Sequence, residues 1–295
     1  MKTPIFCGAS VAIVTPFDRD GSVNYAKLRE LVEMQIEGGT AAITICGTTG
    51  ESSTLTDEEH RRTISKCLEF VNGRIPVIAG TGSNDTEYAV DLSRFAADEG
   101  ASALLLVTPY YNKCTQNGLK KHMLTIIEAA GIPSILYNVP SRTGVSFTAD
   151  TYEALSAHPL VNGVKEASSN FDLICETMHR CGDNLNIWSG NDAETVAIMA
   201  MGGKGVISVV SNVAPKVMST ICALMNEGKT AEAAKLANSI YPMSRDLFIE
   251  TNPIPAKTAM NLMGMEVGGL RMPLCEMAPA NEEKLRASMA ACGLL

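Results

Sequence analysis

The sequence predicts an α/β fold, a (β/α)8 (TIM) barrel with a C-terminal helical appendage. Two observations predict it: eight short apolar runs follow one another along the chain, and stretches with helical spacing of apolar residues separate them. Each run is continuously apolar rather than alternating, as expected for parallel strands that are buried on both faces. Parallel strands need crossover connections, and eight of them can close into a barrel.

The expected strands lie, in chain order, at SVAIVTPF from Ser10, AAITICG from Ala41, PVIAGTG from Pro76, ALLLVTP from Ala103, PSILYNVP from Pro133, VNGVKEAS from Val161, LNIWSGND from Leu185 and GVISVVSN from Gly205. Helices are expected at 25–37, 56–70, 85–99 and 119–130. Thr56 and Glu59 form a capping-box pattern at the start of the second helix. An open doubly wound sheet is the main alternative, but it usually shows G-x-G-x-x-G after the first strand, where this chain has TPFDRDG.

From about Val213 the pattern becomes mainly helical, with expected helices at 218–226 and 230–243. We interpret residues 1–212 as the barrel strands and their connecting helices. Residues 213–295 are then the last barrel helix and a C-terminal helical region that packs with the barrel as one unit. A chain of 295 residues suits a single barrel of this kind.

Composition excludes several classes of function. Hydrophobic residues make up 46% of the chain, which is enough for a large core, and the formal net charge is −8. The negative charge argues against nucleic-acid and anionic-membrane partners. The nine cysteines are scattered and form no C-x-x-C pair, which is typical of reduced thiols in a cytoplasmic protein. Pro4, Gly8 and Pro16 interrupt the N-terminal apolar stretch, so no signal peptide is expected, and no apolar run is long enough for a transmembrane helix.

Polar and charged residues gather where the predicted strands end. They are the segments GTTGE (47–51), TPYYN (108–112), YNVPSRTG (137–144), KE (165–166) and SGND (189–192). Barrel enzymes place their chemistry at the carboxyl ends of the strands. We therefore expect these segments to lie together on one rim.

Lys165 is the strongest candidate for a catalytic residue, because it ends the apolar run VNGVK. A lysine among apolar neighbours loses hydration, which favours the neutral amine that can attack a ketone and form an imine. The alternative is a structural lysine that reaches solvent or pairs with Glu166. Side chains alternate along a strand, so Lys165 and Glu166 point to opposite faces. If Glu166 faced the barrel centre, the site would favour proton abstraction by a carboxylate.

Three further features fit an imine site. Tyr137 lies at a similar height on the neighbouring strand, about 4.8 Å away, where a phenol can shuttle protons, although a tyrosine can also simply line the barrel. GTTGE offers backbone N–H groups and hydroxyls that suit a carboxylate, or it is only a glycine-dependent turn. Arg142 can clamp a carboxylate, unless it is a solvated surface residue.

Metal chemistry is disfavoured. None of the four histidines has metal-ligand spacing, and no acidic cluster occurs at the strand ends. We expect neither a metal nor an organic cofactor. Lys257, in NPIPAK, is interpreted as a structural residue of the helical appendage.

The motifs GTTGE, TPYYN, YNVPSRTG, VKEAS and SGND, in this order, resemble those of the dihydrodipicolinate synthase family. The resemblance runs nearly end to end and includes FIETNPIPAKTAMNLMG near the C-terminus. It implies condensation of pyruvate with L-aspartate-4-semialdehyde on the diaminopimelate route to lysine, without metal or cofactor. It also implies a homotetramer built from two tight dimers.

The resemblance further implies a role for each matching residue. Lys165 would form the imine with pyruvate. Tyr137, Thr48 and Tyr111 would form a proton relay, with Tyr111 reaching in from a partner subunit. The residues implied to contact substrates are Thr49 and Ile207 for pyruvate, Arg142 for the carboxylate of the second substrate, and Gly190 in the wall of the pocket.

Other class I pyruvate aldolases share the imine lysine and the tyrosine. N-acetylneuraminate lyase and 2-keto-3-deoxy sugar-acid aldolases differ from the synthases in the loop after strand five. Here that loop reads VPSRTG, with an arginine suited to a carboxylated aldehyde, so the synthase is favoured. A non-catalytic relative would normally have lost Lys165 or Tyr137, and this chain retains both.

Lysine-inhibited members of the resembled family bind lysine at a dimer interface. Ser52, His60, Asn84 and Tyr110 match that pattern. Asp57 stands where many sensitive members have histidine, and Tyr88 stands where they have glutamate. Because that glutamate anchors an ammonium group, its absence predicts weak or absent feedback by lysine.

Overall fold

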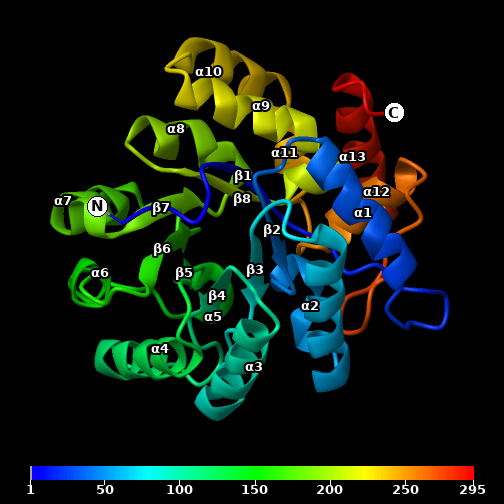
Figure 1. Ribbon diagram of the computed structural model, residues 1–295. Helices are drawn as coiled ribbons and strands as arrows, with labels where there is room; N and C mark the ends of the chain where they lie inside the picture. The colour runs from blue at the N-terminus through cyan, green and yellow to red at the C-terminus, as the bar shows by residue number, and fades with distance from the viewer. Residues whose placement is uncertain (1) are drawn as a thin grey trace.

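The computed structural model describes residues 2–295 and contains one closed barrel of parallel strands in the order β1 to β8 (Figure 1). The strands are β1 Gly8–Ala12, β2 Ala42–Ile45, β3 Val77–Gly80, β4 Ala103–Val107, β5 Ser134–Asn138, β6 Val161–Glu166, β7 Asn186–Ser189 and β8 Gly205–Ser208. Strand β8 pairs with β1 and closes the barrel. The predicted (β/α)8 barrel is confirmed, with each strand inside or next to its predicted apolar run.

Helices connect successive strands and surround the barrel (Figure 1). They are α1 Tyr25–Glu37, α2 Asp57–Val71, α3 Thr86–Asp98, α4 Gln116–Ala130, α5 Pro140–Thr143, α6 Ala149–Ser156, α7 Phe171–Cys181, α8 Thr195–Ala200 and α9 Pro215–Asn226. The predicted capping box is present: the Thr56 hydroxyl accepts from the Glu59 N–H, and the Glu59 carboxylate accepts from the Thr56 N–H. Helix α4 starts three residues before the predicted position, because Thr115 caps it by accepting from the Gly118 N–H.

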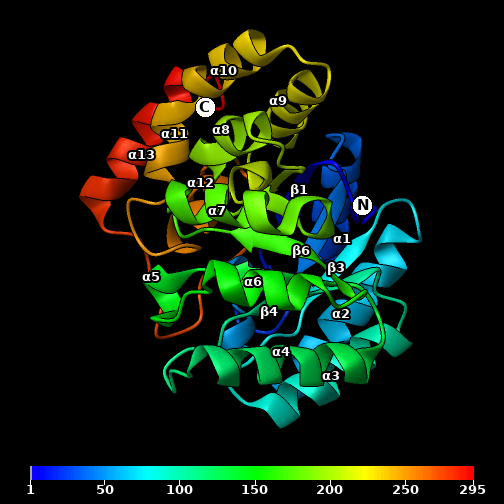
Figure 2. The same ribbon diagram turned by 90° about the vertical axis from the view of Figure 1, so that its left-hand side faces the viewer.

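Four more helices complete the chain: α10 Thr230–Ser239, α11 Tyr241–Asp246, α12 Ile254–Leu262 and α13 Pro279–Ala291. The prediction of a single helix at 230–243 was wrong. It divides into α10 and α11 because Pro242 stands in the first turn of α11, and a proline ring and its missing N–H prevent one helix from running through. Figure 2 shows α5, α11, α12 and α13 on one side of the barrel, away from the N-terminus.

Short 3₁₀ helices follow several strands. They are η1 Thr48–Gly50, η2 Ser52–Thr54, η3 Gly182–Asn184, η4 Asp192–Glu194 and η5 Val210–Asn212. Helix α12 packs on η5, so the C-terminal region reaches the carboxyl-end rim of the barrel. None of the helices in residues 2–295 is long and apolar enough to cross a membrane.

Two apolar layers stabilise the barrel. A large cluster lies between the strands and the helices, and a smaller one fills the barrel interior. In the interior, Trp188 is fully buried, stacks on Phe6 with ring centroids 5.0 Å apart, and donates its indole N–H to the Phe6 carbonyl. This packing closes the amino-terminal end of the barrel, so the open end is the rim where the strands finish.

Candidate active site

Lys165 and Tyr137 lie side by side in a cavity at the open end of the barrel. They are direct partners in the β5–β6 pairing, and the Lys165 Nζ lies 4.3 Å from the centroid of the Tyr137 ring. Lys165 is only 5% exposed, yet it lines a cavity of about 510 Å³. The amine is therefore sheltered from bulk water and accessible to a small molecule.

Glu166 points to the outer face of strand β6. The alternation of side chains had left open whether Lys165 or Glu166 faces the barrel centre, and the structure places Lys165 there. Its carboxylate accepts from the Asn138 side chain, from the Tyr152 hydroxyl at 2.9 Å and from the Ser168 N–H at 2.8 Å. Burial raises the pKa of Glu166 against these donors. The carboxylate joins β5, β6 and α6 outside the barrel and has no access to the cavity, so it cannot serve as the base of a proton-transfer site there.

Polar groups from several strand ends and from the C-terminal region line the same cavity. The lining residues are Thr49, Tyr137, Val139, Ser141, Arg142, Lys165, Ala167, Gly190, Asn191, Val209 and the segment 248–252. The structure thus brings together Lys165, Tyr137, Thr49, Arg142 and Gly190. Ile207 is fully buried in the interior cluster that also contains Tyr137, and Thr48 lines a small adjoining cavity of about 30 Å³ to which Tyr137 also contributes.

Hydrogen bonds hold the loop 47–51 from two sides. The Thr15 hydroxyl donates to the Gly50 carbonyl at 2.6 Å, and the Asn252 side-chain amide donates to the Thr49 hydroxyl at 2.9 Å. A Cβ on Gly50 would lie 3.2 Å from both the Ile13 carbonyl oxygen and the Thr15 hydroxyl. A glycine at this position therefore lets the loop lie close against β1.

Asn252 is a buried site residue that sequence reasoning missed. Its side chain bonds Thr49, and its carbonyl accepts from the Arg142 guanidinium at 3.0 Å. Its side-chain oxygen is buried and has no hydrogen-bond partner within residues 2–295. Asn252 thus contacts the two residues that were predicted to meet the two substrate carboxylates. No spacing pattern in NPIPAK marks this role, because the contacts join segments far apart in the chain.

Sequence reasoning placed Asp192 on the rim but gave it no role. Its buried carboxylate accepts from the Ser208 hydroxyl, from the Val209 N–H at 2.9 Å and from the Val210 N–H at 3.2 Å. Burial raises the pKa of Asp192, while these donors and the charge of Lys165 favour its ionised form. Asp192 fixes the end of β8 beside Ile207.

Comparison with known proteins identifies the family. A model of the Dihydrodipicolinate synthetase family matches residues 5–292. The chain belongs to this family. It is 49% identical to the 4-hydroxy-tetrahydrodipicolinate synthase of Clostridium novyi (strain NT), over 97% of this chain and 96% of that protein. It is 50% identical to that of Thermoanaerobacter sp. (strain X514), over 99% and 98%.

Solved structures of this family superimpose closely on the chain. Dihydrodipicolinate synthase from Aquifex aeolicus gives a TM-score of 0.96 at 44% identity, over 98% of this chain and 99% of that one. The chloride-inhibited synthase from Acinetobacter baumannii, complexed with pyruvate, gives 0.96 at 43% identity over the same shares. The predicted family is confirmed. The predicted activity, that of a 4-hydroxy-tetrahydrodipicolinate synthase, is confirmed by relatives that match over the full chain.

Tyr111, the remaining member of the predicted relay, lies outside the cavity of its own chain. Its side chain is 93% exposed, and its backbone has a positive φ of 70° in the loop after β4. Tyr110, beside it, is also exposed, and its carbonyl accepts from Asn84 at 3.1 Å. Of the three residues of the predicted relay, Tyr137 and Thr48 thus line the cavities at the barrel mouth, whereas Tyr111 is exposed to solvent.

His60, which matches the lysine-site pattern, and Asp57, which departs from it, both have partners within the chain. His60 is buried, its Nε2 lies 2.9 Å from the Gly80 carbonyl oxygen, and burial lowers its pKa. Asp57 pairs with Arg61 at 2.8 Å, and this hydrogen bond lowers the Asp57 pKa. Ser52 begins η2 and is half-buried.

Among residues 2–295, no group of three or more His, Cys, Asp or Glu could hold a metal ion.

Proposed function

We propose that the chain condenses pyruvate with L-aspartate-4-semialdehyde through an imine on Lys165, in the diaminopimelate route to lysine. The observation that carries this proposal is the sheltered amine of Lys165 beside the Tyr137 phenol, at the mouth of the barrel. A buried amine, a phenol and a cluster of donors for carboxylates supply what an imine-forming aldol condensation requires.

The reaction begins when the neutral Lys165 Nζ attacks the ketone carbon of pyruvate. A carbinolamine forms, and loss of water gives the imine. Loss of a proton from the methyl carbon then gives an enamine, which attacks the aldehyde carbon of the semialdehyde and forms the new carbon–carbon bond. The amino group of the condensed product displaces Lys165, which closes the ring and frees the enzyme. The proposed steps call on no metal and no organic cofactor.

Tyr137 is assigned the proton transfers at Lys165, because its ring lies against the amine. Thr48 lines the adjoining cavity with Tyr137 and extends the relay. The cavity wall supplies the substrate contacts: Thr49 for the pyruvate carboxylate through its N–H, together with Ile207, and Arg142 for the carboxylate of the semialdehyde. Gly190 lies against the wall, where a Cβ would come within 2.6 Å of the Ala167 side chain.

Reduction with borohydride in the presence of pyruvate tests the proposal directly. We expect a stable adduct by mass spectrometry, with peptide mapping to Lys165 and no adduct in Lys165→Ala. Parallel assays with semialdehyde, sugar and sialic-acid-derived aldehydes distinguish the synthase from another pyruvate aldolase. An intact protein without adduct, or an adduct on a different lysine, refutes the mechanism, and preference for a polyol aldehyde refutes the second substrate.

We further propose that Tyr111 completes the relay of a second copy of the chain, in a tetramer built from two dimers. Its exposure and its place at the tip of a loop support this assignment. Mixing the inactive variants Lys165→Ala and Tyr111→Phe tests it, because a mixed dimer contains one complete site. Recovery of activity on mixing supports the assignment. A monomer by sedimentation with full activity in Tyr111→Phe contradicts it.

We propose that the enzyme acts in the cytoplasm and is weakly inhibited by lysine or not at all. Nine free cysteines support a location in the cytoplasm.

The surroundings of Asp57 and Tyr88 support weak or absent inhibition by lysine. Asp57 forms an ion pair with Arg61. Burial raises the pKa of Tyr88, and the nearby Asp57 carboxylate raises it further. No carboxylate is left at position 88 for an ammonium group. A sub-millimolar inhibition constant for L-lysine would contradict this.

A further inference from the structure

Glu51, the last residue of the GTTGE loop, points away from the catalytic cavity into a buried ion pair. Its side chain is 1% exposed, and its Oε1 lies 2.7 Å from the Nζ of Lys257, which is 2% exposed. Its Oε2 accepts from the backbone N–H of Arg271, 220 positions further along the chain, at 3.0 Å. Both oxygens of one loop carboxylate are therefore held by the C-terminal region.

Lys257 is fixed on three sides. Besides Glu51, its Nζ donates to the Gly269 carbonyl at 2.7 Å and lies 3.9 Å from the centroid of the Phe17 ring. Burial lowers the pKa of Lys257 to about 8, although the Glu51 carboxylate opposes this shift. Gly268 has a φ of 79°, and a Cβ there would lie 2.0 Å from the Phe17 carbonyl oxygen, so only glycine lets this segment lie so close to Phe17.

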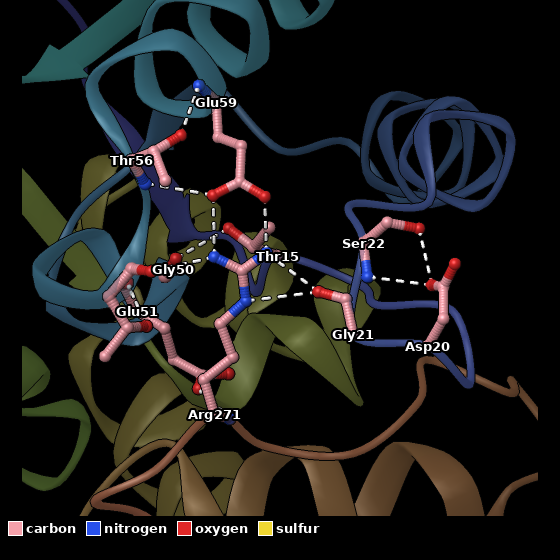
Figure 3. Close-up of polar contacts among 10 residues, drawn as sticks. Thr15, Asp20, Gly21, Ser22, Gly50, Glu51, Thr56, Glu59 and Arg271 are labelled. Atoms are coloured by element: carbon pink, nitrogen blue, oxygen red, sulfur yellow. Dashed lines mark hydrogen bonds and ion pairs between the residues drawn. The ribbon is translucent and has the colours of Figure 1, made fainter.

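Arg271 holds the residues that follow Glu51 (Figure 3). Its guanidinium donates to the Thr54 carbonyl at 2.7 Å, to both carboxylate oxygens of Glu59, and to the Gly21 carbonyl at 2.8 Å. The Thr54 N–H in turn donates to the Glu51 carbonyl at 3.0 Å. The segment from Glu51 to Thr54 is thus anchored at both its ends by the same C-terminal strap, residues 267–271.

The backbone at Glu51 shows why this anchoring matters for the site. Glu51 has a φ of 52°, a left-handed conformation that a non-glycine residue adopts at a cost. It ends the turn η1, where the Glu51 N–H donates to the Thr48 carbonyl at 3.1 Å and the Gly50 N–H donates to the Gly47 carbonyl at 3.0 Å. The side-chain contacts of Glu51 therefore hold the conformation in which Thr49 lines the main cavity and Thr48 lines the small adjoining one.

We propose that Glu51 is a positioning residue: held by Lys257 and the Arg271 N–H, it sets the turn that presents Thr49 to the pyruvate carboxylate. This rests on the proposed function, since it takes the assignment of Thr49 to pyruvate from there. A buried charge pair stabilises little by itself, but removing one partner is costly. Its contribution here is to fix one loop geometry.

Glu51→Gln is the main test, because glutamine keeps the shape of the side chain and removes the charge. We expect KM for pyruvate to rise about tenfold, the effect of losing one charge-assisted hydrogen bond between the Thr49 N–H and the pyruvate carboxylate. KM for the semialdehyde should stay within about twofold. Borohydride should still trap a full equivalent of pyruvate on Lys165 at saturating concentration. Lys257→Met should act in the same direction, and the double variant keeps the test usable if that single variant does not fold.

The exposed pair of Lys229 and Glu227 provides matched controls. Its atoms are also 2.7 Å apart, but both side chains are about half exposed. Lys229→Met and Glu227→Gln should leave both KM values unchanged. A folded Glu51→Gln with a lower melting temperature but an unchanged KM for pyruvate shows a merely structural pair and overturns the inference. If the parent enzyme itself fails to trap pyruvate, the proposed function fails first, and the inference falls with it.

Discussion

Glu59 offers a quantitative test of the polar contacts that hold the active-site loop. Its two carboxylate oxygens pair with the guanidinium of Arg271, and one of them also caps α2 by accepting from the Thr56 N–H. These contacts, the Arg271 hydrogen bonds first, lower the pKa of Glu59 from 4.5 to about 2. Glu59→Gln keeps a side chain that can complete the capping box, so the variant isolates the ion pair.

The pKa shift sets the size of the effect and its pH window. A carboxylate with a lowered pKa in the folded state stabilises the fold above pH 4.5, and this stabilisation is lost as the pH falls toward about 2. The full shift corresponds to an upper limit of about 3 kcal/mol. Because the side chain is 24% exposed, solvent screens the pair, and we expect Glu59→Gln to cost about 1–2 kcal/mol at pH 7.

Urea unfolding of the parent and Glu59→Gln at pH 7, 5, 4 and 3 measures this contribution. The difference in the free energy of unfolding should be constant from pH 7 to 5 and should shrink below pH 4.5. Glu69→Gln is the control, because Glu69 pairs with Lys66 at a half-exposed position and should change stability by less than about 0.5 kcal/mol. A difference for Glu59→Gln that stays the same from pH 7 to 3 would refute the reasoning.

Three further predictions concern turnover. Tyr137→Phe should lower kcat by about 10², the scale of a lost acid–base group, and near-normal turnover in steady-state assays would contradict its role. Arg142→Ala should raise KM for the semialdehyde while pyruvate trapping stays nearly intact, and loss of trapping would count against this assignment. Asn252→Ala removes the donor to the Thr49 hydroxyl but keeps the carbonyl that Arg142 contacts. KM for pyruvate should therefore rise by about fivefold, and a larger rise for the semialdehyde would oppose this.

The barrel could be predicted because its evidence is local. Each strand overlaps a short, mainly apolar run, and the capping box of α2 is a four-residue pattern. Topology then places all the carboxyl ends on one rim, which is why Lys165 and Tyr137 were expected as neighbours and prove to be direct partners in the β5–β6 register. Alternation alone could not decide between Lys165 and Glu166. That choice depends on which face of β6 meets Tyr152 on α6, a contact between separate elements.

The residues that the sequence did not reveal share a different property, because their partners lie far along the chain. Glu51 belongs to a motif whose glycines and threonines suggested a carboxylate nest, yet its own carboxylate points the other way, to Lys257. Lys257 was interpreted as structural, and its contact with Glu51 makes it part of the support for that nest.

In the proposed function, the loop 47–51 holds the pyruvate carboxylate through its backbone. A carboxylate of the loop itself beside that anion would oppose binding, because the two negative charges would repel each other. Burying Glu51 behind the loop, against a cation from the C-terminal helices, removes this repulsion and fixes the turn at the same time. The C-terminal region therefore contributes to the active site through Asn252, Lys257 and Arg271, even though none of these three residues belongs to the barrel.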